Sequence, residues 1–175
     1  MNLSEALQLI REIPDFPSPG ILFRDITPLL ANGPAFKKVI EELSKNDRGY
    51  SHVVGIEARG FIFGAAIAAE SGVGFVPLRK AGKLPHATIA RNYGLEYGSD
   101  VLEAHIDAVA ASDSVLIVDD VLATGGTIIA AIELMNELGA EISEVVVLFE
   151  IESLGGRARI ESKFPGISIR SVVKA

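Results

Sequence analysis

The pattern of apolar and polar residues predicts alternating helices and strands. Leu3, Leu7 and Ile10 at helical spacing predict a helix over residues 3–12, and Pro34 suits the first position of a second helix, 34–45. Further helices are predicted over the small residues 61–71 and over residues 126–138, where Gly139 ends the helix. Short apolar or alternating runs predict strands over residues 21–23, 52–56, 73–78, 102–107, 114–118, 144–149 and 167–173. Prolines and a glycine between residues 14 and 20 break the regular pattern near the start.

From residue 52 onward, predicted strands alternate with predicted helices. This order is typical of an α/β fold with a mainly parallel, twisted sheet that is flanked by helices. A length of 175 residues fits one domain, so we expect residues 1–175 to form a single domain. The basic, turn-rich segment 79–98 shows no sustained periodicity, and we interpret it as a long functional loop.

The composition narrows the class of protein. Hydrophobic residues make up 49% of the chain and charged residues 22%, which is typical of a globular protein. No apolar run approaches the roughly 18 residues that cross a bilayer, and the first residues lack the basic stretch of a secretory signal. The absence of cysteine excludes disulfides and thiolate chemistry, and a net charge of −7 argues against nucleic acid as a partner. We therefore expect a cytoplasmic protein with neither a membrane nor a nucleic-acid partner.

The strongest chemical signal is the run Val-Leu-Ile-Val-Asp-Asp-Val-Leu-Ala-Thr-Gly-Gly-Thr at residues 115–127. An apolar strand is predicted to end there in two carboxylates, and a glycine-rich turn then begins a helix. The first turn of a helix has unpaired backbone N–H groups and a partial positive charge of roughly half a unit. Glycines let the backbone approach an anion and threonine hydroxyls add donors, so this turn is a candidate phosphate site.

Asp119 and Asp120 indicate a second kind of ligand beside the phosphate. Two carboxylates would repel a phosphate unless they faced hydroxyl groups or held a metal ion, and ribose and Mg²⁺ both meet that condition. An ordinary strand–turn–helix with solvated acids is the plain alternative, but the pair lies directly behind an apolar strand. The chain contains neither Gly-x-x-x-x-Gly-Lys-Ser/Thr nor Gly-x-Gly-x-x-Gly after a strand, which weakens other phosphate-binding folds.

Residues 115–127 closely resemble the phosphoribosyl pyrophosphate motif of the type I phosphoribosyltransferases. Within that family, their amino-acid sequence is similar to the motif of the adenine-specific branch. Segments 16–28, 55–61 and 79–98 also resemble that branch, in the same order. The resemblance implies that adenine and phosphoribosyl pyrophosphate give AMP and pyrophosphate through an oxocarbenium-like transition state. It further implies Mg²⁺ as a cofactor, a homodimer, a base-binding hood over residues 1–30 and a mobile catalytic loop over residues 79–98.

The same resemblance implies a role for each matching residue. Ribose and the 5′-phosphate would be bound by Asp119, Asp120, Ala123, Thr124, Gly125, Gly126 and Thr127. Pyrophosphate would be bound by Glu57, Ala58, Arg59, Arg79, Lys80, Lys83 and Tyr97, with a cis peptide bond between Glu57 and Ala58. Adenine would be bound by Leu22, Phe23, Arg24 and Val121.

Glu96 and Arg59 are the residues to which the resemblance assigns catalysis. Oxopurine members of the family have an Asp at the position of Ala123, so proton transfer is assigned here to Glu96 in the loop. Mg²⁺ would be carried by the pyrophosphate, near Asp119 and Asp120, without a certain protein ligand.

Two other functions stay open beside this one. The chain could be a phosphoribosyltransferase for another base, or a regulator that senses phosphoribosyl pyrophosphate without catalysis. The regulator would carry an added nucleic-acid-binding segment or a basic patch, and the sequence shows neither.

Overall fold

The computed structural model describes residues 1–46, 49–94 and 100–175, and it divides into two compact units, Met1–Lys45 and Asn46–Ala175. The N-terminal unit extends past residue 30, where the predicted hood ends. The hood, and a single domain over the whole chain, stay predictions.

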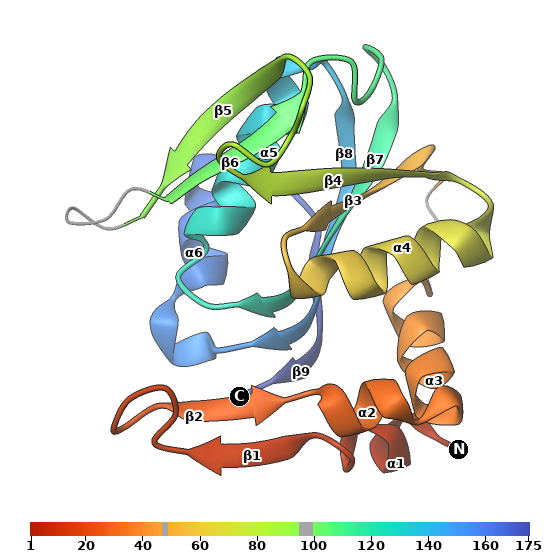
Figure 1. Cartoon of the computed structure of the whole chain (residues 1–175), viewed down its shortest axis with the longest axis vertical. Coiled ribbons are helices and arrows are strands. Elements are labelled where there is room, and N and C mark those ends of the chain that lie inside the picture. Colours follow the sequence, from red (N-terminus) through yellow and green to blue (C-terminus); the bar gives the residue numbers. More distant parts are fainter. Residues whose placement is uncertain (47–48, 95–99) are drawn as a thin grey trace. The chain divides into compact units, whose positions relative to one another are not determined.

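The N-terminal unit combines short helices with a two-stranded antiparallel sheet (Figure 1). The predicted helix over residues 3–12 is wrong beyond Leu7, because residues 11–14 pair with residues 22–25 as a strand. Pairing with a neighbouring strand here outweighs the helical spacing of the apolar residues. The elements are α1 (Leu3–Leu7), β1 (Arg11–Pro14), β2 (Leu22–Asp25), α2 (Thr27–Ala31) and α3 (Gly33–Leu43).

The C-terminal unit is built on a sheet whose described strands have the order β5-β6-β4-β3-β7-β8-β9 (Figure 1). Five neighbouring strands of this sheet, β4, β3, β7, β8 and β9, are parallel. Strand β6 pairs antiparallel with β4, and β5 pairs antiparallel with β6 at the edge. The strands are β3 (His52–Ile56), β4 (Gly74–Lys80), β5 (Thr88–Tyr93), β6 (Asp100–His105), β7 (Ser114–Leu122), β8 (Glu141–Glu150) and β9 (Ile169–Lys174). The helices are α4 (Arg59–Ser71), α5 (Gly126–Glu137), the 3₁₀ turn η1 (Glu152–Leu154) and α6 (Gly156–Lys163).

Both faces of the central strand β7 are buried. Successive residues of a strand point to opposite faces. Val115 and Ile117 pack in the apolar core that contains α5, and the intervening Leu116 and Val118 are equally buried. Helix α4 packs on β3 and β7, and α5 packs on β5 to β8. The predicted α/β fold, with a mainly parallel sheet flanked by helices, is confirmed.

In the C-terminal unit, β7, β5 and α6 also differ from the sequence-based prediction. Strand β7 does not end at Val118 but continues through both aspartates, because it pairs with β8 as far as Leu122. Residues 88–93, which were expected to lie in an irregular loop, form the edge strand β5. An edge strand pairs on one side only and keeps polar residues at the surface, so its apolar pattern is weak. Helix α6 was not predicted, since it buries only Gly156 and Ile160.

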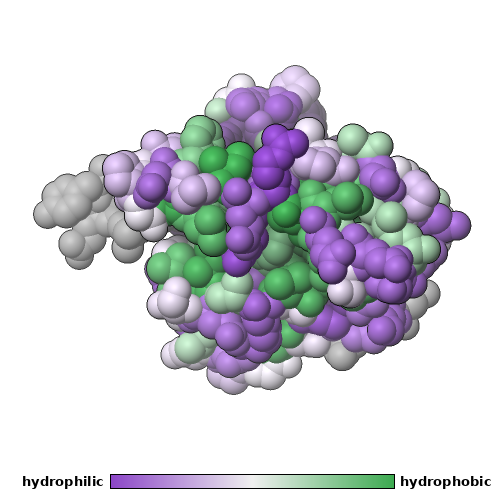
Figure 2. All heavy atoms as spheres, turned by 90° about the horizontal axis from the view of Figure 1, so that it is seen from below, coloured by the Kyte–Doolittle hydropathy of each residue, from purple (hydrophilic) through white to green (hydrophobic). Residues whose placement is uncertain are grey.

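The surface of the described residues contains both hydrophobic and hydrophilic side chains. On the face shown in Figure 2, hydrophobic patches lie between hydrophilic side chains. The described helices include none that is both long enough and apolar enough to span a membrane.

Candidate active site

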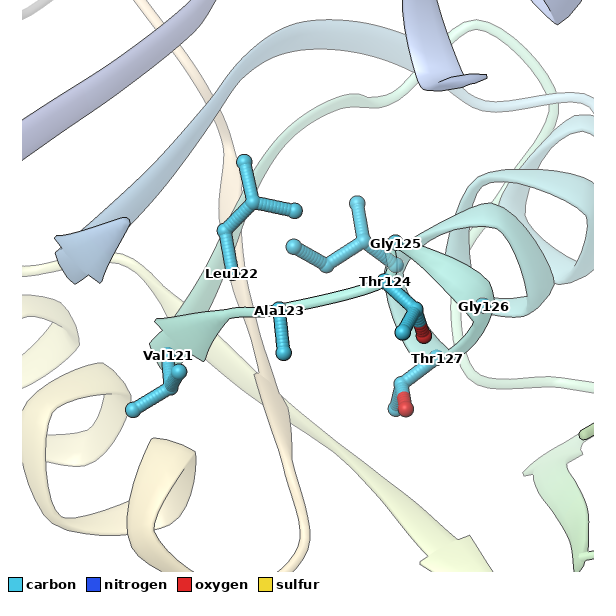
Figure 3. A pocket seen from close by; sticks show the side chains of 8 residues that line it. Val121, Leu122, Ala123, Thr124, Gly125, Gly126 and Thr127 are labelled. Carbon is cyan, nitrogen blue, oxygen red and sulfur yellow. The ribbon is translucent and has the colours of Figure 1, made fainter. Parts of the chain in front are cut away.

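The turn between β7 and α5 forms an open hollow of about 240 Å³, lined by residues 121–128 (Figure 3). Gly125 is the residue before the first turn of α5 and has a φ of 82°, a conformation that glycine adopts readily. In Figure 3 the hydroxyl groups of Thr124 and Thr127 lie on the same side of the turn. The hollow therefore combines hydroxyl donors with the N-terminus of a helix, an arrangement that suits an anion. We call residues 121–128 the phosphate turn.

The start of helix α6 packs directly behind the phosphate turn. A Cβ atom on Gly125 would lie 2.8 Å from the carbonyl oxygen of Gly156. A Cβ atom on Gly156 would overlap the carbonyl oxygen of Ala123. Glycine is therefore required on both sides of the contact, and the backbone of α6 fixes the shape of the turn from behind.

Asp119 and Asp120 are buried at the end of β7, with 9% and 6% of their surfaces exposed. The backbone N–H of Asp120 donates a 2.9 Å hydrogen bond to Oδ1 of Asp119. Burial is the main cause that raises the pKa of Asp119 well above its usual value, and the neighbouring charge of Asp120 adds to it. Burial also raises the pKa of Asp120, although the charge of Arg59 opposes that shift. Keeping both groups ionised therefore requires a cation or several hydroxyl donors close by.

Arg59 is the cation that the structure places beside this pair. Its Nε lies 2.8 Å from Oδ2 of Asp120, as an ion pair without the alignment of a hydrogen bond. Arg59 is the first residue of α4, and the peptide bond between Glu57 and Ala58 is cis, as the family resemblance implied. A Cβ atom on Gly60 would lie 2.8 Å from the carbonyl oxygen of Val118. The start of α4 is thus packed tightly against the carboxylate pair.

Glu57 contacts basic residues at the end of β4 and just after it. Its carboxylate lies 2.7 Å from Nζ of Lys83 and 3.4 Å from Nε of Arg79, and it accepts a 2.9 Å hydrogen bond from the backbone N–H of Lys80. Burial disfavours the charged form of Glu57, but these hydrogen bonds outweigh it and lower its pKa to about 2. Glu57 therefore stays ionised at neutral pH and holds two cations in place. We call Glu57, Arg79 and Lys83 the cationic cluster.

Other predicted site residues are not joined to these features by the structure. Leu22, Phe23 and Arg24 belong to β2 of the N-terminal unit. Within that unit the ring of Phe23 packs edge-on against Phe16, with centroids 5.1 Å apart. Glu96 and Tyr97 lie outside the described residues.

Two residues that the sequence did not single out lie beside the phosphate turn. The Cβ of Tyr93 and Nη1 of Arg159 lie 3.9 Å and 4.0 Å from the place that a Cβ on Gly126 would occupy. Both come from elements that the apolar pattern failed to reveal, β5 and α6. The one local signal was the adjacent pair Gly155 and Gly156 before two arginines.

The family model for the phosphoribosyl transferase domain matches residues 29–165. The chain therefore belongs to the phosphoribosyltransferase family, whose phosphate motif the sequence resembles. Within that family it groups with the adenine phosphoribosyltransferases, as the individual relatives show. The chain is 51% identical over 173 residues to the adenine phosphoribosyltransferase of Shewanella frigidimarina, a match that covers 98% of this chain and 94% of that one.

Solved structures agree with this grouping. The adenine phosphoribosyltransferase of Thermoanaerobacter pseudethanolicus is 48% identical, with a TM-score of 0.91 over 99% of this chain and 100% of that one. The enzyme of Saccharomyces cerevisiae, solved with adenine and an imino-altritol bisphosphate, is 38% identical, with a TM-score of 0.89 over 98% of each chain.

Proposed function

We propose that this protein transfers the phosphoribosyl group of phosphoribosyl pyrophosphate to adenine, which yields AMP and pyrophosphate. One observation carries the proposal: the buried Asp120, which directly precedes the phosphate turn, pairs with Arg59 at 2.8 Å. That contact connects the site for one phosphate group to a cation that could bind a second phosphate group. A sugar that carries phosphate groups at both ends needs such an arrangement, with polar groups for its hydroxyls in between.

The sugar would be held by β7 and the phosphate turn. The backbone and hydroxyl donors of residues 123–127 bind the 5′-phosphate, and Asp119 and Asp120 accept hydrogen bonds from the ribose hydroxyls. Hydrogen bonds from the sugar would also relieve the cost of burying these two carboxylates. Binding at the phosphate end orients the anomeric carbon, which lies away from the turn.

Pyrophosphate would leave towards Arg59 and the cationic cluster. Bonding between the anomeric carbon and the pyrophosphate oxygen breaks as bonding to the adenine nitrogen forms, so negative charge accumulates on the leaving group. Arg59, Arg79 and Lys83 stabilise that charge, and Lys80 adds a further cation at the surface. The Glu57 carboxylate is suited to holding these cations, while backbone N–H groups next to it are suited to the pyrophosphate itself.

Mg²⁺ would enter the site bound to the substrate, phosphoribosyl pyrophosphate. The donors fit in kind, because Asp119 and Asp120 offer carboxylate oxygens. Oδ2 of Asp120 pairs with Arg59 and accepts no hydrogen bond from the described residues. Mg²⁺ commonly binds through one or two carboxylates together with substrate phosphates. The ion would supply further neutralisation of charge on the leaving group.

Adenine would bind to the N-terminal segment, with Val121 at the edge of the sugar site. Phe23 offers an aromatic face for stacking, and the backbone of Leu22 and Arg24 offers neutral groups that can read the edge of the base. Glu96 would assist proton transfer on the purine. The active form would be a homodimer in the cytoplasm.

The test is turnover with phosphoribosyl pyrophosphate and Mg²⁺, with adenine, hypoxanthine, guanine, xanthine and uracil offered separately. We expect AMP from adenine and no product from the other bases. Turnover of another base in place of adenine would contradict the proposed specificity for adenine, but it would agree with the proposed site for phosphoribosyl pyrophosphate. Binding of phosphoribosyl pyrophosphate without any turnover would favour a sensor.

The role of Glu96 has a test of its own. Glu96→Gln should lower kcat by about a hundredfold or more, because general acid–base assistance contributes on that scale. The Kd of phosphoribosyl pyrophosphate should stay within about twofold, a change far below the 1.4 kcal/mol that a tenfold effect represents. Glu103→Gln, an acid on the neighbouring β6, is the control. An unchanged kcat in the Glu96 variant would remove Glu96 from the mechanism.

A further inference from the structure

Arg159 differs from the other arginines that the structure describes in the C-terminal unit. The others each pair with a carboxylate: Arg59, Arg79, Arg91, Arg157 and Arg170. Within residues 46, 49–94 and 100–175, Arg159 forms no such ion pair, and its side chain is exposed. Among the described residues it has one side-chain hydrogen bond, from Nη1 to the carbonyl oxygen of Thr124, at 3.4 Å. A guanidinium has five N–H donors, so most of its hydrogen-bonding capacity remains for a ligand.

The fold fixes Arg159 beside the phosphate turn through its neighbour Arg157. Arg157 donates two hydrogen bonds to Glu150, of 2.8 and 2.6 Å, and a third of 2.9 Å to the carbonyl oxygen of Ile169. These bonds tie the first turn of α6 to β8 and β9. Residues two positions apart on a helix point about 200° apart, so Arg159 faces away from those strands. Together with the contact between Gly156 and Ala123, this places Arg159 over the turn.

The phosphate turn itself has no cationic side chain. Residues 121–128 contain neither lysine nor arginine, and two buried carboxylates directly precede them. A sugar phosphate brings roughly two negative charges at neutral pH, whereas the helix N-terminus offers about half a positive charge. Nη1 of Arg159 lies 4.0 Å from the place of a Cβ on Gly126, the first residue of α5. A phosphate group that accepts hydrogen bonds from the first N–H groups of α5 would therefore lie within reach of this guanidinium.

We infer that Arg159 binds the 5′-phosphate of phosphoribosyl pyrophosphate and of AMP, as the cationic partner of the phosphate turn. This inference rests on the proposed assignment of the turn to the 5′-phosphate. Arg159 supplies the charge that distinguishes a phosphorylated sugar from an unphosphorylated one. Its hydrogen bond to the Thr124 carbonyl orients the guanidinium for a charge-assisted contact.

The experiment compares AMP with adenosine, which lacks the phosphate, as ligands in isothermal titration calorimetry. Arg159→Gln keeps an amide donor for the Thr124 carbonyl but removes the charge, whereas Arg159→Lys keeps the charge. We expect Arg159→Gln to raise the Kd of AMP about tenfold and to leave that of adenosine unchanged. Arg159→Lys should raise the Kd of AMP only about threefold, because the charge stays while the planar fork is lost. Lys163→Gln, which removes a charge elsewhere on α6, is the matched control and should change neither Kd.

A second variant separates failure of this inference from failure of the proposed site. Thr124→Ala combined with Thr127→Ala removes the hydroxyl donors of the turn and should also weaken AMP binding. If this variant weakens AMP binding and Arg159→Gln does not, the role of Arg159 is overturned and the phosphate turn stands. If neither weakens it, the assignment of the turn falls, and the role of Arg159 falls with it. An equal loss of AMP and adenosine binding in Arg159→Gln would mean that Arg159 only shapes the site, which also overturns the inference.

Discussion

The phosphate turn and the cationic cluster offer different kinds of groups for binding an anion. The turn uses backbone and hydroxyl groups, and its shape depends on the close contact of Gly125 with Gly156. The cluster uses side-chain cations held by the carboxylate of Glu57. The turn is therefore sensitive to steric change, whereas the cluster is sensitive to the loss of charge.

This difference suits the two ends of the proposed substrate. The 5′-phosphate stays on the sugar throughout the reaction, so a fixed backbone cradle can hold it in one place. Pyrophosphate gains charge and then leaves, and the side-chain cations that Glu57 holds in place can stabilise that charge. The carboxylates Asp119 and Asp120 directly precede the phosphate turn, and Asp120 pairs with Arg59, which lies two residues after Glu57 in the chain.

The largest effect is expected where the two regions meet. Asp119→Asn combined with Asp120→Asn should abolish detectable binding of phosphoribosyl pyrophosphate, as measured by calorimetry. The free energy of unfolding at pH 7 should stay equal or rise by about 1 kcal/mol. An acid whose pKa is raised on folding is less stable as the charged form in the folded state, so the neutral amide removes a cost. Asp107→Asn, an exposed acid, is the control.

Normal binding in the double variant would show that the carboxylates do not contact the sugar. A large loss of stability with the fold intact in the control would instead show that they are structural.

The next largest effect is expected where the backbone of α6 packs against the phosphate turn. Gly156→Ala places a methyl group against the carbonyl oxygen of Ala123, so the turn or α6 must shift. We expect a loss of about 1–3 kcal/mol in the free energy of unfolding, as for other overpacked sites. The kcat/KM for phosphoribosyl pyrophosphate should fall by about tenfold or more, because small displacements of a positioning group cost rate on this scale. Gly33→Ala, whose methyl group would meet nothing within 4 Å, should change neither quantity. Full activity in the Gly156 variant would break the argument that α6 shapes the turn.

The smallest effect concerns the cationic cluster. Glu57→Gln leaves Arg79 and Lys83 in the chain but loosens them, so the KM for phosphoribosyl pyrophosphate should rise only about fivefold, which corresponds to about 1 kcal/mol. Activity assays at two salt concentrations would check it, because loosened surface charges are screened more strongly.

The pH dependence of stability sharpens the same prediction. The pKa of Glu57 falls from 4.5 to about 2 on folding, so its contribution to stability is present above pH 4.5 and is lost as the pH falls towards 2. Urea unfolding of the wild type and of Glu57→Gln at pH 7, 5 and 3 should show a difference that shrinks only at the lowest pH. Glu150 has a pKa of about 2 as well and remains in both proteins, so the comparison cancels its effect. A difference that is independent of pH would contradict the ion-pair role of Glu57.

The sequence by itself determined the parallel strands of the sheet and the chemistry of its central strand. Uninterrupted apolar runs such as residues 115–118 are buried on both faces, and this burial identifies parallel strands without knowledge of their neighbours. The acids, glycines and threonines that follow lie in one continuous segment, so their chemistry could be recognised from local order alone. The cis peptide bond at Glu57 and Ala58 was recognised in the same local way, by family resemblance.

Only the tertiary structure decided which distant residues support that segment. Strand β5 and helix α6 expose much of their surface and show weak apolar patterns, so neither could be predicted from spacing. Their positions depend on pairing with β6 and on the bonds between Arg157 and Glu150, which join residues far from the motif or outside it. The ion pair between Arg59 and Asp120 and the place of Arg159 beside Thr124 arise in the same way. A sequence shows which groups are available, but long-range packing decides which of them meet.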